Sequence, residues 1–219
     1  MHFEVLVEDR SGGIALKHIL EKILGPDNQD HTYEIRRYKG LGRIPANLGS
    51  APDPRKKLLL DHLPTLLRAY GKSLAHVDAA VVVVVDLDYR DCRAFKEELL
   101  DVLESTDPAP TTLFRIAIEE GEAWLLGDRD ALRQAYPRVK ENVLRGYIQD
   151  SVCGTWEVLA DAVYPGGSGK LKPQGYPVIG RAKCEWADRI APLMDINANQ
   201  SRSFQVFRDG VRRLAGIDR

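Results

Sequence analysis

Two aspartates follow a run of apolar residues closely enough that metal binding is the first chemistry to consider. Residues 79–85 have the sequence A-A-V-V-V-V-V, and Asp86 and Asp88 come directly after them, followed by Asp91. An unbroken run of small and β-branched residues predicts a central strand of a parallel sheet, covered by helices on both faces. Ligands of such sheets bind in the crevice beyond the carboxyl ends of the strands. Carboxylate oxygens placed there suit a hard divalent cation such as Mg²⁺.

Acidic residues also follow two other expected strands. Glu8 comes after the first strand of the chain, and Glu119 and Glu122 come after the last. A helix that began near Glu119 would place these two glutamates on one face, at i and i+3. One or two Mg²⁺ or Mn²⁺ ions bound at this edge could polarise a phosphodiester, activate water and stabilise the leaving oxygen. The expected metal ligands are Glu8, Asp86, Asp88, Glu119 and Glu122.

Each of these acids also has a structural interpretation that the sequence leaves open. The aspartate pair could end its strand and cap the following helix, and glutamates in a helix's first turn favour the helix dipole. Ser11 could cap the first helix and leave Glu8 solvated. Three independent caps would rarely fall at three strand ends of one sheet edge, so a shared metal site accounts better for the acids together.

Basic residues gather on two glycine-bearing segments, which favours contacts with phosphate groups. The first segment surrounds K-G-L-G-R at residues 39–43, for which a solvated strand end is an equally good interpretation. The second is an expected loop at residues 165–177. Its G-G-S-G-K sequence lacks the first glycine and the final Ser or Thr of a phosphate-binding P-loop. The candidate nucleic-acid-binding residues are Arg36, Arg37, Lys39, Arg43, Lys170, Lys172 and Lys183.

Composition places the chain among ordinary soluble globular proteins, with 44% hydrophobic and 29% charged residues. The net charge of −1 argues against a protein that holds nucleic acid by overall charge, so local patches and a metal must supply the contacts. No stretch approaches the roughly 18–20 apolar residues of a membrane span. The N-terminus lacks a basic signal region. Cys92, Cys153 and Cys184 have no Cys-x-x-Cys spacing, and we expect a reducing cytoplasm and no structural zinc.

Strand and helix patterns alternate along the first part of the chain and predict an α/β fold. We expect a mainly parallel, Rossmann-like sheet flanked by helices over residues 1–128, and a helical C-terminal subdomain packed on it over 129–219. The expected strands are 3–7, 32–38, 79–85 and 113–118. One expected helix begins near residue 14. The other expected helices span residues 53–70, 92–103, 130–147, 151–162, 184–194 and 203–214. In the last helix, Phe204, Phe207, Val211 and Leu214 form a core-facing stripe.

Two motifs resemble the Toprim domain. V-E-D-R-S-G follows the first strand and V-V-D-L-D-Y-R-D follows a later one. Topoisomerases of types II and IA, primases, recombination-repair proteins and the overcoming-lysogenization-defect nucleases share this domain, whose pattern is a glutamate after the first strand and Asp-x-Asp after a later one. The resemblance covers residues 1–128.

Two further motifs resemble the bacterial and archaeal DUF4276 proteins over the whole length of the chain. They are R-I-A-I-E-E-G-E-A-W-L-L-G-D and the closing S-R-S-F-Q-V-F. That family consists of small Toprim-like proteins, some of them encoded in phage-defence loci. The E-A-W-L-L box together with D-L-D-Y-R-D is fairly specific, whereas a lone D-x-D is not.

The resemblance implies a role for each matching acid. Glu8 corresponds to the Toprim glutamate, a metal ligand or acid/base group, and Asp86 and Asp88 correspond to the metal-binding pair. Glu122 corresponds to the acid of the E-A-W-L-L box. Asp9 stands where many Toprim domains have glycine, so it either adds a ligand or leaves the backbone less free to approach phosphate.

The resemblance therefore implies a Mg²⁺-dependent endonuclease that hydrolyses nucleic-acid phosphodiesters, DNA or RNA, with a role in phage defence. Tyr89 is expected to pack on the sheet edge, so metal-activated water is favoured over a tyrosine nucleophile. Lys183 or Lys140 could stabilise developing charge. Two alternatives stay open. One is a catalytically silent Toprim-like binding or sensor module that docks on an ATPase or another defence protein. The other is a D-x-D nucleotide-sugar transferase.

Overall fold

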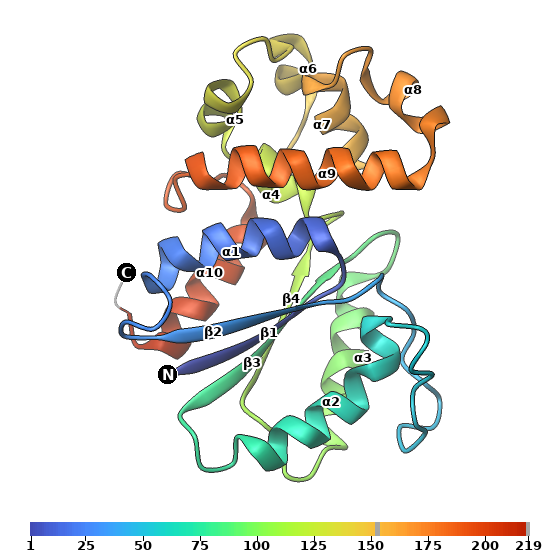
Figure 1. The fold of residues 1–219 in the computed structure, drawn as a ribbon, viewed down its shortest axis with the longest axis vertical. Coiled ribbons are helices and arrows are strands. Elements are labelled where there is room, and N and C mark those ends of the chain that lie inside the picture. The colour runs from blue at the N-terminus through green and yellow to red at the C-terminus, as the bar shows by residue number, and fades with distance from the viewer. Residues whose placement is uncertain (152–153, 218–219) are drawn as a thin grey trace.

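The structure is a computed structural model that describes residues 1–151 and 154–217. Within these residues, four parallel strands form one sheet in the order β2-β1-β3-β4 (Figure 1). The strands are β1 (His2–Val7), β2 (Thr32–Arg37), β3 (Ala79–Asp86) and β4 (Thr112–Ala117). A helix follows each strand, as the alternating pattern predicts, and a helical region follows the sheet. The α/β fold is thereby confirmed.

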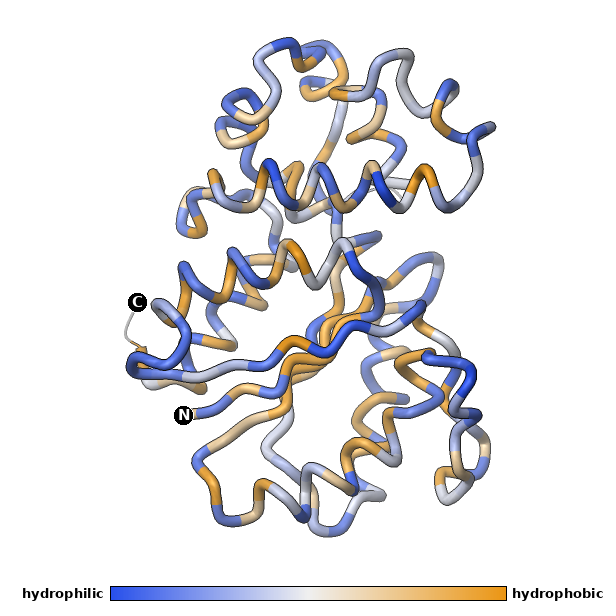
Figure 2. Tube along the Cα trace, in the orientation of Figure 1, coloured by the Kyte–Doolittle hydropathy of each residue, from blue (hydrophilic) through white to orange (hydrophobic). Residues whose placement is uncertain are grey.

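Helices cover both faces of the sheet. On one face lie α1 (Arg10–Leu24) and α10 (Arg202–Ala215), and on the other lie α2 (Leu59–Ser73) and α3 (Cys92–Glu104) (Figure 1). Alternate valines of β3 enter the two cores: Val82 and Val84 pack on the α1 side, and Val81 and Val83 on the α2 side. Because both faces of β3 are buried, its sequence shows no alternation of polar and apolar residues. Figure 2 shows this hydrophobic centre and the hydrophilic loops around it.

The region after β4 forms a helical lobe beyond the sheet, and its last helix returns to the sheet. The helices are α4 (Glu122–Leu126), α5 (Arg129–Ala135), α6 (Glu141–Gly146), α7 (Thr155–Val163), α8 (Gly167–Leu171) and α9 (Tyr176–Ile190), with 3₁₀ turns η1 (Lys172–Gln174) and η2 (Ala191–Leu193). Helix α9 packs against α1, and α10 packs against β4. The expected stripe on α10 is confirmed at Phe204, Phe207 and Val211, which are fully buried.

The helix expected from Asp53 begins later, at Leu59. Residues 39–41 form backbone hydrogen bonds with the segment around the start of α2. The Lys39 N–H donates to the Lys57 carbonyl, and the Leu59 N–H donates to the Gly40 carbonyl. This backbone pairing keeps Leu58 extended, so the helix begins only after it.

The loop expected at 165–177 is largely helical. Gly166 and Gly167 have φ of 89° and 69°, which opens a tight turn into α8, and Asp161 accepts a hydrogen bond from the Ser168 N–H. Helix α9 begins at Tyr176, earlier than expected, because Pro177 falls in its first turn, where proline is tolerated. The glycines and the proline of this segment therefore lie at the starts of α8 and α9, where they are compatible with helix.

The helix expected at 130–147 is two helices. Pro137 lies between α5 and α6, and the residue before a proline is biased away from helical geometry. Tyr136 has φ −131° and ψ 83°, as this restriction requires.

Cys92 and Cys184 are free thiols, and Cys153 lies outside the described residues. Among the helices of the described chain, none is both long and apolar enough to cross a membrane.

The aromatic contact of α10 yields a stability prediction. Phe207 lies 4.9 Å from Trp124 between ring centroids. Phe207→Ala should lower the free energy of unfolding by about 3–5 kcal/mol, because it removes buried area and leaves a cavity. The neighbouring Val206, which is 41% exposed, is the matched control. Val206→Ala should change the free energy of unfolding by less than about 0.5 kcal/mol. Urea denaturation of the three proteins measures both values, and equal losses would contradict this packing.

Candidate metal-binding site

The strand register brings three acidic strand ends to one edge of the sheet. Strand β3 lies between β1 and β4, with Val7 opposite Val84 and Asp86 opposite Ala117. Glu8 therefore leaves β1 at the level at which Asp86 ends β3. The connection from β4 to α4 passes over the same point, since a Cβ built on Gly121 would lie 3.7 Å from Asp86 Oδ1.

Glu8 and Asp86 are in direct contact. The backbone N–H of Asp86 donates a hydrogen bond to Glu8 Oε2 at 3.3 Å. Asp9 follows Glu8 and caps α1, accepting from the Gly12 N–H at 2.6 Å and from the Ser11 hydroxyl. The cap is thus Asp9 and not Ser11. A Cβ at Gly12 would lie 2.8 Å from Val7 Cγ2, so only glycine allows α1 to start this close to the strand.

Glu122 reaches the same place from the first turn of α4, and Lys183 reaches it from α9. Lys183 Nζ lies 3.1 Å from Glu122 Oε2, and the two side chains are only 18% and 5% exposed. The lysine comes from the far end of the sequence, where α9 packs across α1 and α4. Of the two candidates for charge stabilisation, Lys183 is therefore at the site, whereas Lys140 lies at the start of α6 beside another groove.

These side chains surround a small cavity of about 30 Å³, enough for a water-sized group. Its polar lining consists of Glu8, Asp9, Ser11, Asp86, Glu122 and Lys183. Leu16, Trp124 and Ala187 supply much of its apolar wall. Several carboxylates thus share a poorly hydrated space with one ammonium group.

This environment shifts the acids toward their protonated forms. Burial raises the pKa of Glu8 to about 7, with the charges of Asp9 and Asp88 adding to the effect. Burial also raises the pKa of Glu122 to about 7, against the opposing charge of Lys183. Burial and then the charge of Glu8 raise the pKa of Asp86 well above its usual range. Such shifts at a cleft are typical of functional sites.

Lys183 stays charged in this environment. Burial lowers the pKa of its ammonium group, but the charges of Glu122, Asp86 and Asp9 outweigh burial and leave the pKa above its ordinary value. It therefore balances part, and only part, of the negative charge of the acids around the cavity.

Asp88 and Glu119 lie side by side in unusual backbone conformations. Their φ angles are 51° and 74°, in the left-handed region that side chains other than glycine rarely adopt, and the Asp88 N–H donates to the Glu119 carbonyl at 3.0 Å. Asp88 is exposed at the rim, and its charge acts on Glu8. The Glu119 carboxylate is buried and accepts a hydrogen bond from Tyr147 at 3.3 Å. Helix α4 begins at Glu122, so the expectation of a shared helical face with Glu119 was wrong.

The side chains at this site offer the oxygen ligands that Mg²⁺ prefers, but further ligands are needed to complete its coordination. In the part of the chain that the structure describes, no three Asp, Glu, His or Cys side chains are arranged to hold a metal ion among themselves. Mg²⁺ commonly binds through one or two carboxylates, completed by water and substrate phosphate. Asp86, with Glu8 beside it and Asp88 at the rim, offers such a partial set of hard oxygen ligands.

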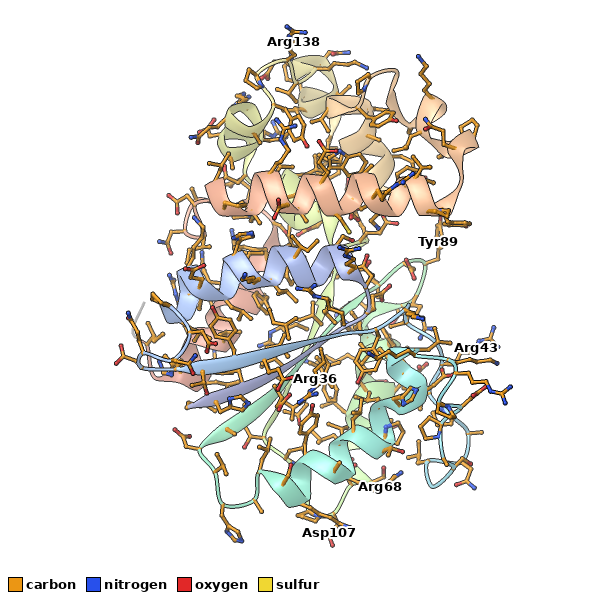
Figure 3. All side chains as sticks on the ribbon, viewed as in Figure 1. Arg36, Arg43, Arg68, Tyr89, Asp107 and Arg138 are labelled. Atoms are coloured by element: carbon orange, nitrogen blue, oxygen red, sulfur yellow. The ribbon has the colours of Figure 1, made fainter. Side chains whose placement is uncertain are left out.

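The basic residues expected to bind nucleic acid do not form one surface. Arg36 lies on the α2 side of the sheet, pairing with Glu4 at 2.9 Å (Figure 3). Arg37 points to the other face, where a Cβ on Gly13 would lie 2.5 Å from its Nε. Arg43 extends into solvent (Figure 3), and Lys39 is exposed. Lys170 and Lys172 are exposed on α8 and η1, with Lys172 paired to Glu157.

Sequence reasoning missed the links that join the lobe to the site. Glu120 accepts hydrogen bonds from Thr155 Oγ1 and the Trp156 N–H, which fixes the start of α7 beside the β4–α4 connection. Trp124 Nε1 donates to Ser203 at 2.9 Å, so the E-A-W-L-L and S-R-S-F segments pack on each other. No local pattern signals these contacts between distant segments. Asp91 accepts from the Arg93 and Ala94 N–H groups and caps α3, so the cap of this helix is Asp91 and not Asp86 or Asp88.

No protein-family model, curated protein or solved structure matches this chain. The Toprim and DUF4276 resemblances therefore stand on the quoted motifs.

The raised pKa values predict a dependence of stability on pH. The folded state binds protons at Glu8, Asp86 and Glu122 more tightly than the unfolded chain does. Their contribution to the stability of the folded state is therefore full below the unfolded pKa of about 4, and the contribution of Glu8 and Glu122 is lost as pH rises through about 7. In metal-free buffer at pH 8, Asp86→Asn should therefore raise Tm above wild type by about 3 °C or more. Toward pH 4, where the contribution of the protonated acids is full, the two Tm values should converge.

A matched control for this experiment is Glu97→Gln, which removes one exposed carboxylate on α3. Its Tm should follow wild type at both pH values when all three proteins are measured by differential scanning calorimetry. An Asp86→Asn variant less stable than wild type at pH 8 would contradict the repulsion described above.

Proposed function

We propose that this chain is a Mg²⁺-dependent endonuclease of Toprim type, which hydrolyses phosphodiesters of nucleic acid. The observation that supports it most is the convergence of Glu8, Asp86 and Glu122, from the ends of β1 and β3 and the start of α4, on one cavity that also holds the Lys183 ammonium. The strained backbone at Asp88 and Glu119 adds support, because such conformations cluster at functional sites.

Each residue receives a role from its surroundings. Asp86 and Asp88 would hold the ion, which when bound supplies positive charge to the phosphodiester and lowers the pKa of water. Glu8 has a pKa of about 7 and can accept and release a proton near neutral pH, which suits a general base. The ammonium of Lys183 stays charged and can stabilise negative charge on phosphate oxygens in the transition state. Glu122 holds that ammonium in position at 3.1 Å.

A second candidate is a catalytically silent binding or sensor module with a protein partner such as an ATPase. The ion pair between Lys183 and Glu122 favours it, because this pair uses one of the acids expected to bind metal. The two candidates differ in whether metal-dependent cleavage occurs, and a substitution at Asp88 separates chemistry from binding.

Asp88→Ala should lower Mg²⁺-dependent cleavage of plasmid DNA or tRNA by about 100-fold or more, if Asp88 holds charge needed in the transition state. Nucleic-acid affinity should stay within about threefold of wild type, because affinity comes mostly from phosphate contacts by Lys and Arg. Cleavage is followed on gels, and affinity by gel shift.

Asp91→Ala is the matched control, since Asp91 lies in the same loop and only caps α3. It should retain cleavage despite some loss of stability. If Asp88→Ala cleaves at the wild-type rate, or if pure wild-type protein does not cleave with Mg²⁺ or Mn²⁺, the endonuclease proposal is wrong and the binding module is favoured.

A further inference from the structure

Two tyrosines are exposed far beyond the usual level for aromatic side chains. Tyr89 is 91% exposed and Tyr176 is 89% exposed, whereas the next most exposed large hydrophobic residue, Ile148, is 72% exposed. Neither ring serves the described core, and the expectation that Tyr89 packs on the sheet edge was wrong. Aromatic rings held in solvent are available to stack on a ligand.

Tyr89 lies in the loop between β3 and α3, just after the strand end that carries Asp86. It follows Asp88, whose charge acts on Glu8, and the turn that carries it is tied down by backbone hydrogen bonds. Leu87 donates to the Ala117 carbonyl, and Arg90 donates to the Leu87 carbonyl. Figure 3 shows the side chain pointing away from the sheet into solvent. The loop is therefore anchored while its aromatic tip is free of protein contacts in the core.

Tyr176 lies in the lobe, on the helix that carries Lys183. It is the first residue of α9, two helical turns before Lys183 and on the same face of the helix. Two turns correspond to about 10 Å along the axis. Because Lys183 Nζ contacts Glu122 inside the cavity, the start of α9 lies about two helical turns from the residue that reaches the acids.

Two arginines lie near the segment of α9 that carries Lys183. Arg37 packs over the first turn of α1 at Gly13, next to Arg10. Burial raises the pKa of the Cys184 thiol, and the charges of Arg10 and Arg37 oppose this, so both guanidinium groups lie near the residue that follows Lys183. Guanidinium groups together with exposed aromatic rings are features of single-strand binders, in which cations contact the backbone and rings stack on bases.

We propose that Tyr89 and Tyr176 stack on unpaired bases on either side of the acidic cavity, so that the substrate is single-stranded nucleic acid or a single-stranded segment of a folded one. The inference rests on the proposed endonuclease function for its substrate. In a duplex, the faces of the bases are already stacked on each other and are not accessible to these rings. The tyrosines therefore discriminate unpaired strands from duplexes. The arginines do not, because both kinds of strand present phosphate groups.

The test is fluorescence anisotropy with a labelled single-stranded oligonucleotide and with its duplex, in EDTA at fixed salt so that no cleavage occurs. Tyr89→Ala and Tyr176→Ala should each weaken single-strand binding about tenfold, within the range that stacking on one base provides. Duplex binding should change by less than about threefold. Tyr89→Phe, which keeps the ring, should restore single-strand affinity to within about twofold of wild type.

Val77→Ala is the matched control: Val77 is 53% exposed and lies before β3, at the opposite edge of the sheet. If the alanine variants at the tyrosines weaken single-strand binding no more than Val77→Ala does, or weaken duplex binding equally, the inference is overturned. Cleavage is measured separately with Mg²⁺. Tyrosine-dependent binding without cleavage would end the endonuclease proposal and leave this inference standing, whereas cleavage without tyrosine dependence would do the reverse.

Discussion

The positive charge of the Lys183 ammonium group allows the acidic side chains at the strand ends to lie close together. Carboxylates enclosed together repel one another and lose hydration, so their crowding is costly without a cation. Lys183 enters this group from α9 and contacts Glu122 at 3.1 Å. One ammonium does not balance Glu8, Asp86 and Glu122 when all are ionised. The remaining negative charge gives the site its affinity for protons and, in our proposal, for a divalent cation.

Two parts of the fold bring Lys183 and the acids together: the sheet places the acids, and the lobe places the lysine. The double burial of β3 fixes it between β1 and β4, and the parallel register then brings their carboxyl ends together. The lobe is held over this edge by α9 on α1 and by Trp124, which donates to Ser203 and packs on Phe207. The segments that resemble DUF4276 proteins thus act first in positioning the lobe, and through it Lys183.

The sequence predicts the sheet well because the signals are local. A valine run without polar alternation indicates a strand covered on both faces, and acids after strands of a parallel sheet must share an edge. It predicts less where distant segments decide. Pairing of residues 39–41 with 57–60 delays α2, and Pro137 divides a pattern that looked continuous. Nothing near Lys183 indicates that its side chain enters the acidic cavity, because packing of α9 on α1 and α4 places it there.

A metal site at the carboxyl edge of the sheet is tested most directly by titrating Mn²⁺ into the purified protein and following the EPR signal of the free ion. We expect saturable binding at neutral pH, competition by Mg²⁺, and loss of most of this binding in Asp86→Asn but not in Glu97→Gln. Binding that is absent in wild type, or unchanged in Asp86→Asn, would contradict a metal site at the carboxyl edge of this sheet.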